Sequence, residues 1–521
     1  MSKQIAIIPE PVRLDIKGGK FPLSPSCQVV AEGSAVDVAR WFARSIATGT
    51  GLELAVNPSA PANVAGLIWF HLDAGLKSLG SEGYRLSVTP QRVDLFAPEP
   101  AGLFYAAQTI RQLLPPEIFN STPLSGIEWS IPCVEVEDFP RFGWRGSMMD
   151  VGRHFMPKEF VFKFIDLLAL HKLNTFHWHL TEDQGWRIEI TKYPRLTEVG
   201  AWRKETVVGR TYTDSPNPVY DGKPHGGFYT QAEVHEVVEY ARQRFIRVVP
   251  EIELPGHCQA AIAAYPELGN TGQKLEVGTL WGIYEHVYNV EENTFRFLFN
   301  VLEEVLGLFP GQFIHIGGDE VPKKEWKQSA AAQNRLQELG LANEDELQSY
   351  FIRRIDRYLS GHGRRLVGWD EILEGGLARG ATVMSWRGEE GGITAANAGH
   401  DVVMAPHQHT YLNYQQTRED STGIQHGDYL PLTKVYGYEP VPAAIDPGKA
   451  QHVLGAQAQL WSEFIPDSLR MEYMAYPRLC ALSEVVWTPV AKKDIDSFMT
   501  RIQTHLQRLD RLGVNYCKQI E

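Results

Sequence analysis

The order of apolar and polar residues in the first quarter of the chain predicts a small domain of mixed secondary structure. Apolar and polar residues alternate over residues 84–96 on both sides of a Thr-Pro-Gln turn, which predicts a β-hairpin. Apolar residues then recur at helical spacing over residues 103–114, until two consecutive prolines end the run. We therefore expect residues 1–138 to form an α+β accessory domain, and no cluster of catalytic character occurs in it.

A different rhythm follows residue 138, because short apolar runs now alternate with amphipathic stretches. This rhythm is typical of parallel βα units. Eight candidate strands can be counted, and each leads into a cluster too polar or too aromatic for a plain turn. The sequence thus predicts an α/β fold, with a (β/α)8 TIM barrel over residues 139–490 and an active site at the carboxyl ends of its strands. These ends are expected near residues 150–154, 177–183, 251–257, 319–320, 369–371, 386–387, 409–413 and 461–463.

Local signals also mark where helices begin. Pro157 suits a first helical turn, Thr230 and Glu233 have the spacing of a capping box, and Asn343 is a favourable N-cap. A final amphipathic helix within residues 491–521 is predicted to pack on the barrel as a C-terminal element.

The stretch at residues 313–320 carries the first candidate chemistry. An apolar run ends there in two glycines, which permit a tight turn, and two adjacent acids follow, Asp319 and Glu320. Successive side chains of a strand point to opposite faces, so the acids can act together only if the chain bends at the glycines. Two acids in two environments are typical of enzymes that cleave glycosidic bonds. A general acid must hold its proton near neutral pH, which the adjacent carboxylate and nearby tryptophans would both favour, and the second acid then stays ionised.

Other interpretations of the same stretch have to be weighed. An acidic loop that caps a following helix would show the same residues. The tetrad Gly-Gly-Asp-Glu also opens the signature of cyclic-dinucleotide cyclases, but there it lies in a hairpin and continues with Phe. Here Val321 and Pro322 follow, which argues against that class.

Composition narrows the class of partner and the compartment. The chain of 521 residues has a net charge of −13 and a pI near 5.8, which argues against a nucleic acid or an anionic membrane as partner. The 13 Trp and 20 Tyr offer flat faces that suit sugar rings. Five dispersed cysteines show neither a disulfide framework nor zinc spacing. With no apolar run of 18 residues and no signal peptide, we expect a soluble protein, cytoplasmic as written and periplasmic or secreted if a signal peptide has been removed.

Further motifs follow one another along the barrel. They are Arg153-His154-Phe155 after Asp150, His177-Trp178-His179 with Asp183, Pro255-Gly256-His257, the stretch 315–320, Trp369-Asp370-Glu371, Ser385-Trp386-Arg387-Gly388, Tyr411-Leu412 and Gln459-Leu460-Trp461-Ser462-Glu463. In this order they resemble family 20 glycoside hydrolases, the β-N-acetylhexosaminidases. The resemblance covers residues 140–490, and residues 1–138 are similar to the domain that usually precedes that barrel.

The resemblance implies an exo-acting, retaining β-N-acetylhexosaminidase that removes terminal β-linked GlcNAc or GalNAc from glycans. It assigns to Glu320 the protonation of the glycosidic oxygen and to Asp319 the orientation of the substrate's 2-acetamido group. The acetamido oxygen then attacks the anomeric carbon, and water opens the resulting oxazolinium intermediate with retention. Tyr411 would donate a hydrogen bond to the acetamido carbonyl, while Asp183 and His257 would support the acid.

The resemblance also implies a set of sugar-binding residues, and neither a cofactor nor a metal. A pocket for the acetamido methyl would be lined by three tryptophans, and two charged residues would bind sugar hydroxyls; these are Trp369, Trp386 and Trp461, then Arg153 and Glu463. Asn413 departs from the family, in which many members carry Asp at this position, and Glu253 stands where Asp is common. Because Asn can both donate and accept a hydrogen bond, the preference between GlcNAc and GalNAc stays open.

Two alternative functions belong to different classes. A metal-dependent amidohydrolase would use His177 and His179 as ligands, but it needs further histidines where Trp369 and Trp386 stand. A sugar-binding protein without turnover is disfavoured by the intact pair of acids. Neither the natural glycan nor the oligomeric state can be predicted from the sequence.

Overall fold

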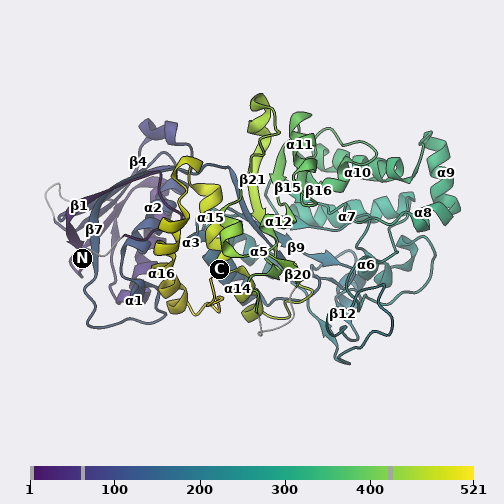
Figure 1. Ribbon diagram of the computed structural model, residues 1–521, viewed down its shortest axis with the longest axis horizontal. Helices are drawn as coiled ribbons and strands as arrows, with labels where there is room; N and C mark the ends of the chain where they lie inside the picture. The colour runs from purple at the N-terminus through teal and green to yellow at the C-terminus, as the bar shows by residue number, and fades with distance from the viewer. Residues whose placement is uncertain (1–4, 60–64, 420–425, 521) are drawn as a thin grey trace.

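The computed structural model describes residues 5–59, 65–419 and 426–520 and shows a sheet domain beside a barrel (Figure 1). The amino-terminal sheet has seven strands in the order β1-β7-β5-β6-β4-β2-β3, and the predicted hairpin is confirmed as the antiparallel pair β5–β6. Helices α1 and α2 pack against this sheet. The bounds are β1 Arg13–Pro22, β2 Gln28–Ala31, β3 Val56–Asn57, β4 Leu67–Leu72, β5 Tyr84–Val88, β6 Arg92–Ala97, β7 Ser130–Asp138, α1 Val36–Thr50 and α2 Pro100–Leu113.

Eight parallel strands close into a barrel, which confirms the predicted TIM-barrel class. Their order around the barrel is β14-β15-β16-β17-β18-β21-β8-β9. The seventh strand ends earlier than expected, because the short helix α12 (His407–Thr410) separates it from residues 411–413. The bounds are β8 Trp144–Asp150, β9 Thr175–His179, β14 Arg247–Glu251, β15 Phe313–His315, β16 Arg365–Trp369, β17 Thr382–Ser385, β18 Val402–Met404 and β21 Val453–Ala458.

Three helices between the strands begin at or next to the residues that the sequence marks, with Pro157 at the N-cap rather than in the first turn. Pro157 immediately precedes α3, the Thr230 and Glu233 side chains complete a capping box, and the Asn343 side chain accepts from two backbone N–H groups of the next helix. The bounds of these and of further helices of the barrel are α3 Lys158–Leu170, α5 Gln231–Arg242, α7 Glu292–Leu308, α10 Glu344–Gly361, α11 Glu390–Asn397, α14 Ser468–Ala475 and α15 Arg478–Trp487.

Short elements decorate the loops around the barrel. Three two-stranded sheets pair β10 with β11, β12 with β13 and β19 with β20. The bounds are β10 Thr181–Glu182, β11 Gly185–Trp186, β12 Trp202–Arg203, β13 His225–Gly226, β19 Tyr414–Gln415, β20 His426–Tyr429, α4 Arg195–Glu198, α6 Gln259–Ala264, α8 Lys324–Gln328, α9 Ala330–Leu339 and α13 Leu432–Tyr436.

The last helix, α16 (Ile495–Arg511), lies against both parts of the molecule (Figure 1). Its Arg501 donates to the Glu484 carboxylate on α15 at 2.6 and 2.7 Å and to the Ile7 carbonyl at 2.8 Å. Its Arg508 donates to the Ala6 and Gln112 carbonyls, both at 2.7 Å. The helix therefore joins the barrel to the amino-terminal domain as well as packing on the barrel. Among the described helices, none combines the length and apolarity needed to cross a membrane.

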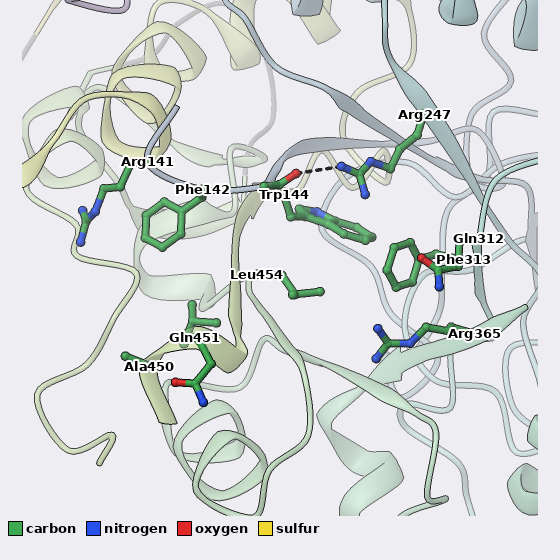
Figure 2. Close-up of a pocket in the computed structure, with 12 residues that line it drawn as sticks. Arg141, Phe142, Trp144, Arg247, Gln312, Phe313, Arg365, Ala450, Gln451 and Leu454 are labelled. Carbon is green, nitrogen blue, oxygen red and sulfur yellow. Dashed lines mark hydrogen bonds between the residues drawn. The ribbon is translucent and has the colours of Figure 1, made fainter. Parts of the chain in front are cut away.

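A cavity of about 590 Å³ lies at the amino-terminal mouth of the barrel, where strands begin rather than end (Figure 2). The Arg247 guanidinium lies 5.5 Å from the Trp144 ring centre, and the Arg365 guanidinium lies 5.4 Å from that of Phe313. The two rings meet edge to face at 5.1 Å. Residues at this end of a TIM barrel serve stability, and the cavity contains none of the predicted site residues.

Candidate active site

The predicted bend is present after β15, and it brings the two acids to one place. Gly317 and Gly318 have φ values of 65° and 93°, and Glu320 itself has a φ of 45°. A Cβ atom on Gly317 would lie 1.8 Å from a carboxylate oxygen of Glu253, so only glycine fits there. A non-glycine residue in the left-handed region is strained, and such strain concentrates at functional sites.

His257, on the loop after β14, touches both acids. Its Nε2 lies 3.4 Å from Glu320 Oε2 and 3.7 Å from Asp319 Oδ2. Its Nδ1 faces two more carboxylates, Glu182 Oε1 at 2.8 Å and Asp183 Oδ2 at 3.1 Å. Burial by itself would lower the pKa of His257, but these carboxylates, Glu182 above all, raise it well above its ordinary value. His257 is therefore an imidazolium at neutral pH.

The protonation of the pair differs from the sequence-based expectation. Burial, reinforced by the charge of Glu320, raises the pKa of Asp319 to about 7 although His257 opposes the shift. Burial would also raise the pKa of Glu320, but its contact with His257 outweighs this and lowers it. The Glu320 side chain is 33% exposed and that of Asp319 is 11% exposed, so water favours charge on Glu320. Below about pH 7 the single proton of the free pair therefore resides on Asp319, the reverse of the expected arrangement.

The three predicted tryptophans meet in one aromatic wall together with Tyr411. The ring centres of Trp369 and Trp461 are 5.6 Å apart, and Tyr411 lies 6.3 Å from Trp461. Tyr411 stacks on Trp386 with an angle of 14° at 6.1 Å. Burial raises the pKa of the Tyr411 phenol well above its ordinary value, so its hydroxyl keeps a proton to donate.

Two buried acidic side chains fix two of these indoles. The Trp369 Nε1–H donates to Glu251 Oε1 at 2.9 Å, and the Trp386 Nε1–H donates to Glu371 Oε2 at 2.9 Å. Burial and the neighbouring Asp319 charge raise the pKa of Glu371 to about 8. Because each indole has a directional hydrogen bond as well as ring contacts, the orientation of the wall is set before any ligand arrives.

Several polar atoms of the predicted site are buried without a hydrogen-bond partner among the described residues. They are Arg153 Nε, His257 Nε2, Asn413 Oδ1 and Asp319 Oδ1. The Arg153 guanidinium lies 4.9 Å from the Trp461 ring centre, and its charge acts on Glu463, whose pKa is raised by burial. Buried polar groups are nearly always hydrogen-bonded. Two donors and two acceptors in a site that also has an aromatic wall therefore suit a ligand that has both polar groups and an apolar face.

Sequence reasoning missed the roles of three acids, Glu182, Glu251 and Glu371. Each lies in a cluster at the end of a predicted strand, and that position was the available signal. Burial was not visible in the sequence, so these carboxylates resembled ordinary rim charges. In the structure Glu182 lies closer than Asp183 to His257, and the other two hold indoles.

The histidines that suggested a metal centre are bound by protein groups. His177 lies 2.9 Å from a Glu251 oxygen and 2.8 Å from the Gln457 amide nitrogen. His179 lies 3.1 Å from both Asp150 and Glu253. These contacts orient both rings inside the barrel, and Trp369 and Trp386 occupy the strand ends where an amidohydrolase needs more histidines.

Comparison with protein-family models assigns the chain. The model described as glycosyl hydrolase family 20, catalytic domain, matches residues 142–490, and that described as glycosyl hydrolase family 20, domain 2, matches residues 4–139. The chain belongs to glycosyl hydrolase family 20. This glycoside hydrolase is 44% identical over 521 residues to a β-hexosaminidase of Porphyromonas gingivalis, covering 99% of this chain and 64% of that protein. It is 36% identical to a β-hexosaminidase of Vibrio furnissii, covering 92% and 76% of the two chains.

Solved structures agree with this family 20 assignment. An exo-β-N-acetylglucosaminidase from Vibrio harveyi in complex with N-acetylglucosamine superposes with a TM-score of 0.86 at 35% identity, covering 98% of this chain and 78% of that one. A family 20 β-N-acetylhexosaminidase from Streptomyces coelicolor gives a TM-score of 0.84 at 29% identity, covering 98% and 97%. These matches argue against the amidohydrolase alternative, because both the barrel and the domain that precedes it match family 20.

Proposed function

We propose that this glycoside hydrolase is an exo-acting, retaining β-N-acetylhexosaminidase that removes terminal β-linked GlcNAc or GalNAc from glycans. Catalysis is assisted by the substrate's own 2-acetamido group, through an oxazolinium intermediate. The observation that carries the proposal is the convergence of Asp319 and Glu320 on His257, beside an aromatic wall whose hydrogen bonds fix its shape.

In the proposed reaction, the acetamido methyl packs among the three tryptophans, and the unpartnered Asp319 Oδ1 accepts the acetamido N–H. Tyr411 donates to the acetamido carbonyl oxygen, which attacks the anomeric carbon. Because this nucleophile is already attached to the substrate, its effective concentration is high and no enzymic nucleophile is needed. Arg153, Asn413 and Glu463 bind sugar hydroxyls, which holds the ring against the wall.

One proton has to change places in the acid pair before the bond breaks. The free pair carries it on Asp319, whereas the reaction needs it on Glu320 for donation to the leaving oxygen. A substrate that covers Glu320 removes its water, which disfavours the charge there, while an acetamido N–H at Asp319 favours the charge there. Substrate binding thus moves the proton between neighbouring carboxyls. His257 and Asp183 support Glu320 during this exchange, and water then opens the intermediate with Glu320 as base.

A set of aryl β-glycosides that differ only at C2 and C4 tests the proposal. N-acetyl-β-glucosaminides should be cleaved at least about 10³-fold better, in kcat/KM, than β-glucosides with the same leaving group, since the latter lack the internal nucleophile. The ratio of glucosaminide to galactosaminide cleavage would settle the preference left open by Asn413. Comparable cleavage of glycosides with and without the acetamido group would refute substrate assistance, and binding of GlcNAc with no cleavage would identify a sugar-binding protein.

A further inference from the structure

Glu182 lies between the sugar-binding and proton-donating sides of the candidate site. Its Oε2 is 2.9 Å from Arg153 Nη2, and its Oε1 is 2.8 Å from His257 Nδ1. Since His257 Nε2 is 3.4 Å from Glu320, one series of contacts runs from Arg153 to the acid. Each link pairs opposite charges, and the contact of His257 Nδ1 with Glu182 is also a charge-assisted hydrogen bond, the stronger kind of polar contact.

The local fold shapes this position for a glutamate. Glu182 belongs to β10, and its own Oε1 accepts the backbone N–H of Asp183 at 2.9 Å, which turns the side chain back toward His257. Gly152 leaves room for it, because a Cβ there would lie 2.5 Å from the Glu182 Cβ. Burial would raise the pKa of Glu182, but Arg153 and His257 lower it to about 2, so the carboxylate is ionised.

Asp183 contacts the same imidazole, but its second hydrogen bond goes to the backbone of the His257 loop and not to Arg153. Its Oδ2 is 3.1 Å from His257 Nδ1, and its Oδ1 accepts the backbone N–H of Gln259 at 2.9 Å, two residues after the histidine. Asp183 thus anchors the loop that carries His257. Of the two acids, Glu182 is the one that also reaches Arg153.

We propose that Glu182 is a positioning residue that couples sugar binding to proton donation, by joining Arg153 to His257 and through it holding Glu320 at the leaving oxygen. The proposal rests on the function proposed above. It requires a bridge of fixed length as well as a charge. A neutral amide at this position loses the charge, and a shorter carboxylate loses the reach to one of the two partners.

Leaving-group dependence distinguishes this role from general support of the fold. Aryl N-acetyl-β-glucosaminides with good leaving groups, such as dinitrophenol, need little proton donation to the glycosidic oxygen. The phenyl substrate has a poor leaving group and depends fully on that proton. We expect Glu182→Gln to lower kcat/KM by on the order of 10²-fold for the phenyl substrate and by less than about tenfold for the dinitrophenyl substrate. Calorimetry should show weaker GlcNAc binding to this variant, because Arg153 loses the nearer of its two carboxylate partners, Glu182 at 2.9 Å and Asp150 at 3.5 Å. Glu182→Asp should show the same dependence to a smaller degree.

The matched control is Glu285→Gln, since Glu285 forms an exposed pair with Lys324 at 2.6 Å and should leave all substrates unaffected. Equal losses for every leaving group in the Glu182 variants, or unchanged GlcNAc binding, would overturn the coupling. If thermal melting shows that Glu182→Gln is not folded, the leaving-group dependence of kcat/KM is measured with Glu182→Asp instead. Failure of the proposed function would look different, because the unaltered enzyme would then cleave none of these substrates faster than the matching glucosides.

Discussion

Replacing His257 by glutamine should move the alkaline limb of the pH profile upward. In the free enzyme the acid pair keeps a single proton, which is lost near the pKa of about 7 assigned to Asp319. The profile of kcat/KM reports such free-enzyme groups, and it gives values for the pair rather than for one residue. Because His257 is cationic and touches both carboxylates, it favours loss of that proton. Without the cation, the pair holds its proton to higher pH.

The distances set the size of the shift. The proton at stake is on Asp319, and two unit charges 3.7 Å apart, the separation of His257 Nε2 and Asp319 Oδ2, interact by about 1 kcal/mol in water and by about 4.5 kcal/mol at an effective dielectric constant near 20. The Asp319 side chain is 11% exposed and beside a partly exposed neighbour, so the value lies between these limits. At about 1.4 kcal/mol per pKa unit, the limb should move up by at least about one pH unit. Glu182 and Asp183, left without their cation, act in the same direction.

The assay is kcat/KM for an aryl N-acetyl-β-glucosaminide from pH 4 to 10, with His257→Gln beside the unaltered enzyme. His452→Gln is the matched control, because His452 pairs with Asp401 at the other end of the barrel, at 3.0 Å. The His257 variant should also be slower at its optimum, since Glu320 loses its support. An alkaline limb that stays in place or moves to lower pH would show that His257 does not act on the acid pair through its charge.

Three further predictions concern the same acids and the barrel histidines. Glu320→Gln should lower turnover of ordinary glycosides by on the order of 10²-fold or more while GlcNAc binding, measured by calorimetry, persists; retained turnover would remove Glu320 from the role of acid. Asp319 has a folded pKa raised from 3.8 to about 7, so its contribution to stability is full below its ordinary pKa and is lost as the pH rises through 7. The difference in melting temperature between Asp319→Asn and the unaltered enzyme should therefore be a few degrees more positive at pH 8 than at pH 4. A difference that does not depend on pH would contradict the burial of this charge. Activity should be unchanged after treatment with EDTA, because His177 and His179 are bound by protein groups, and a loss restored by added zinc would reopen the metal-dependent alternative.

The architecture could be predicted because it follows from repeated, local signals. Apolar runs alternating with amphipathic stretches recur eight times, and glycines before paired acids imply a bend whatever the surroundings. One strand end was misplaced because the polar residues near His409 belong to the helix and turn after β18, and periodicity over a three-residue strand is weak. Signals that depend on spacing along the chain therefore predicted the order of the elements, and they failed only where a strand is very short.

The protonation of the site could not be predicted, because it depends on contacts between distant segments. The sequence shows Asp319 and Glu320 as equal neighbours, and only the fold reveals that His257 lies nearer to Glu320 and that Asp319 is more deeply buried. The bridging position of Glu182 has the same origin, since Arg153 and His257 are remote from each other in the sequence. Spatial pairing of charges decides such features, and no local pattern encodes it.

Helix α16 has a consequence for the order in which the molecule is completed during synthesis. Its arginines hold the backbone carbonyls of Ala6 and Ile7, about five hundred residues earlier in the chain. A nascent chain therefore keeps those carbonyls without their native donors until translation has passed residue 511. We expect the seam between the two domains to close only after the ribosome has released this helix, which makes the seam the last part of the described fold to gain protection from proteases.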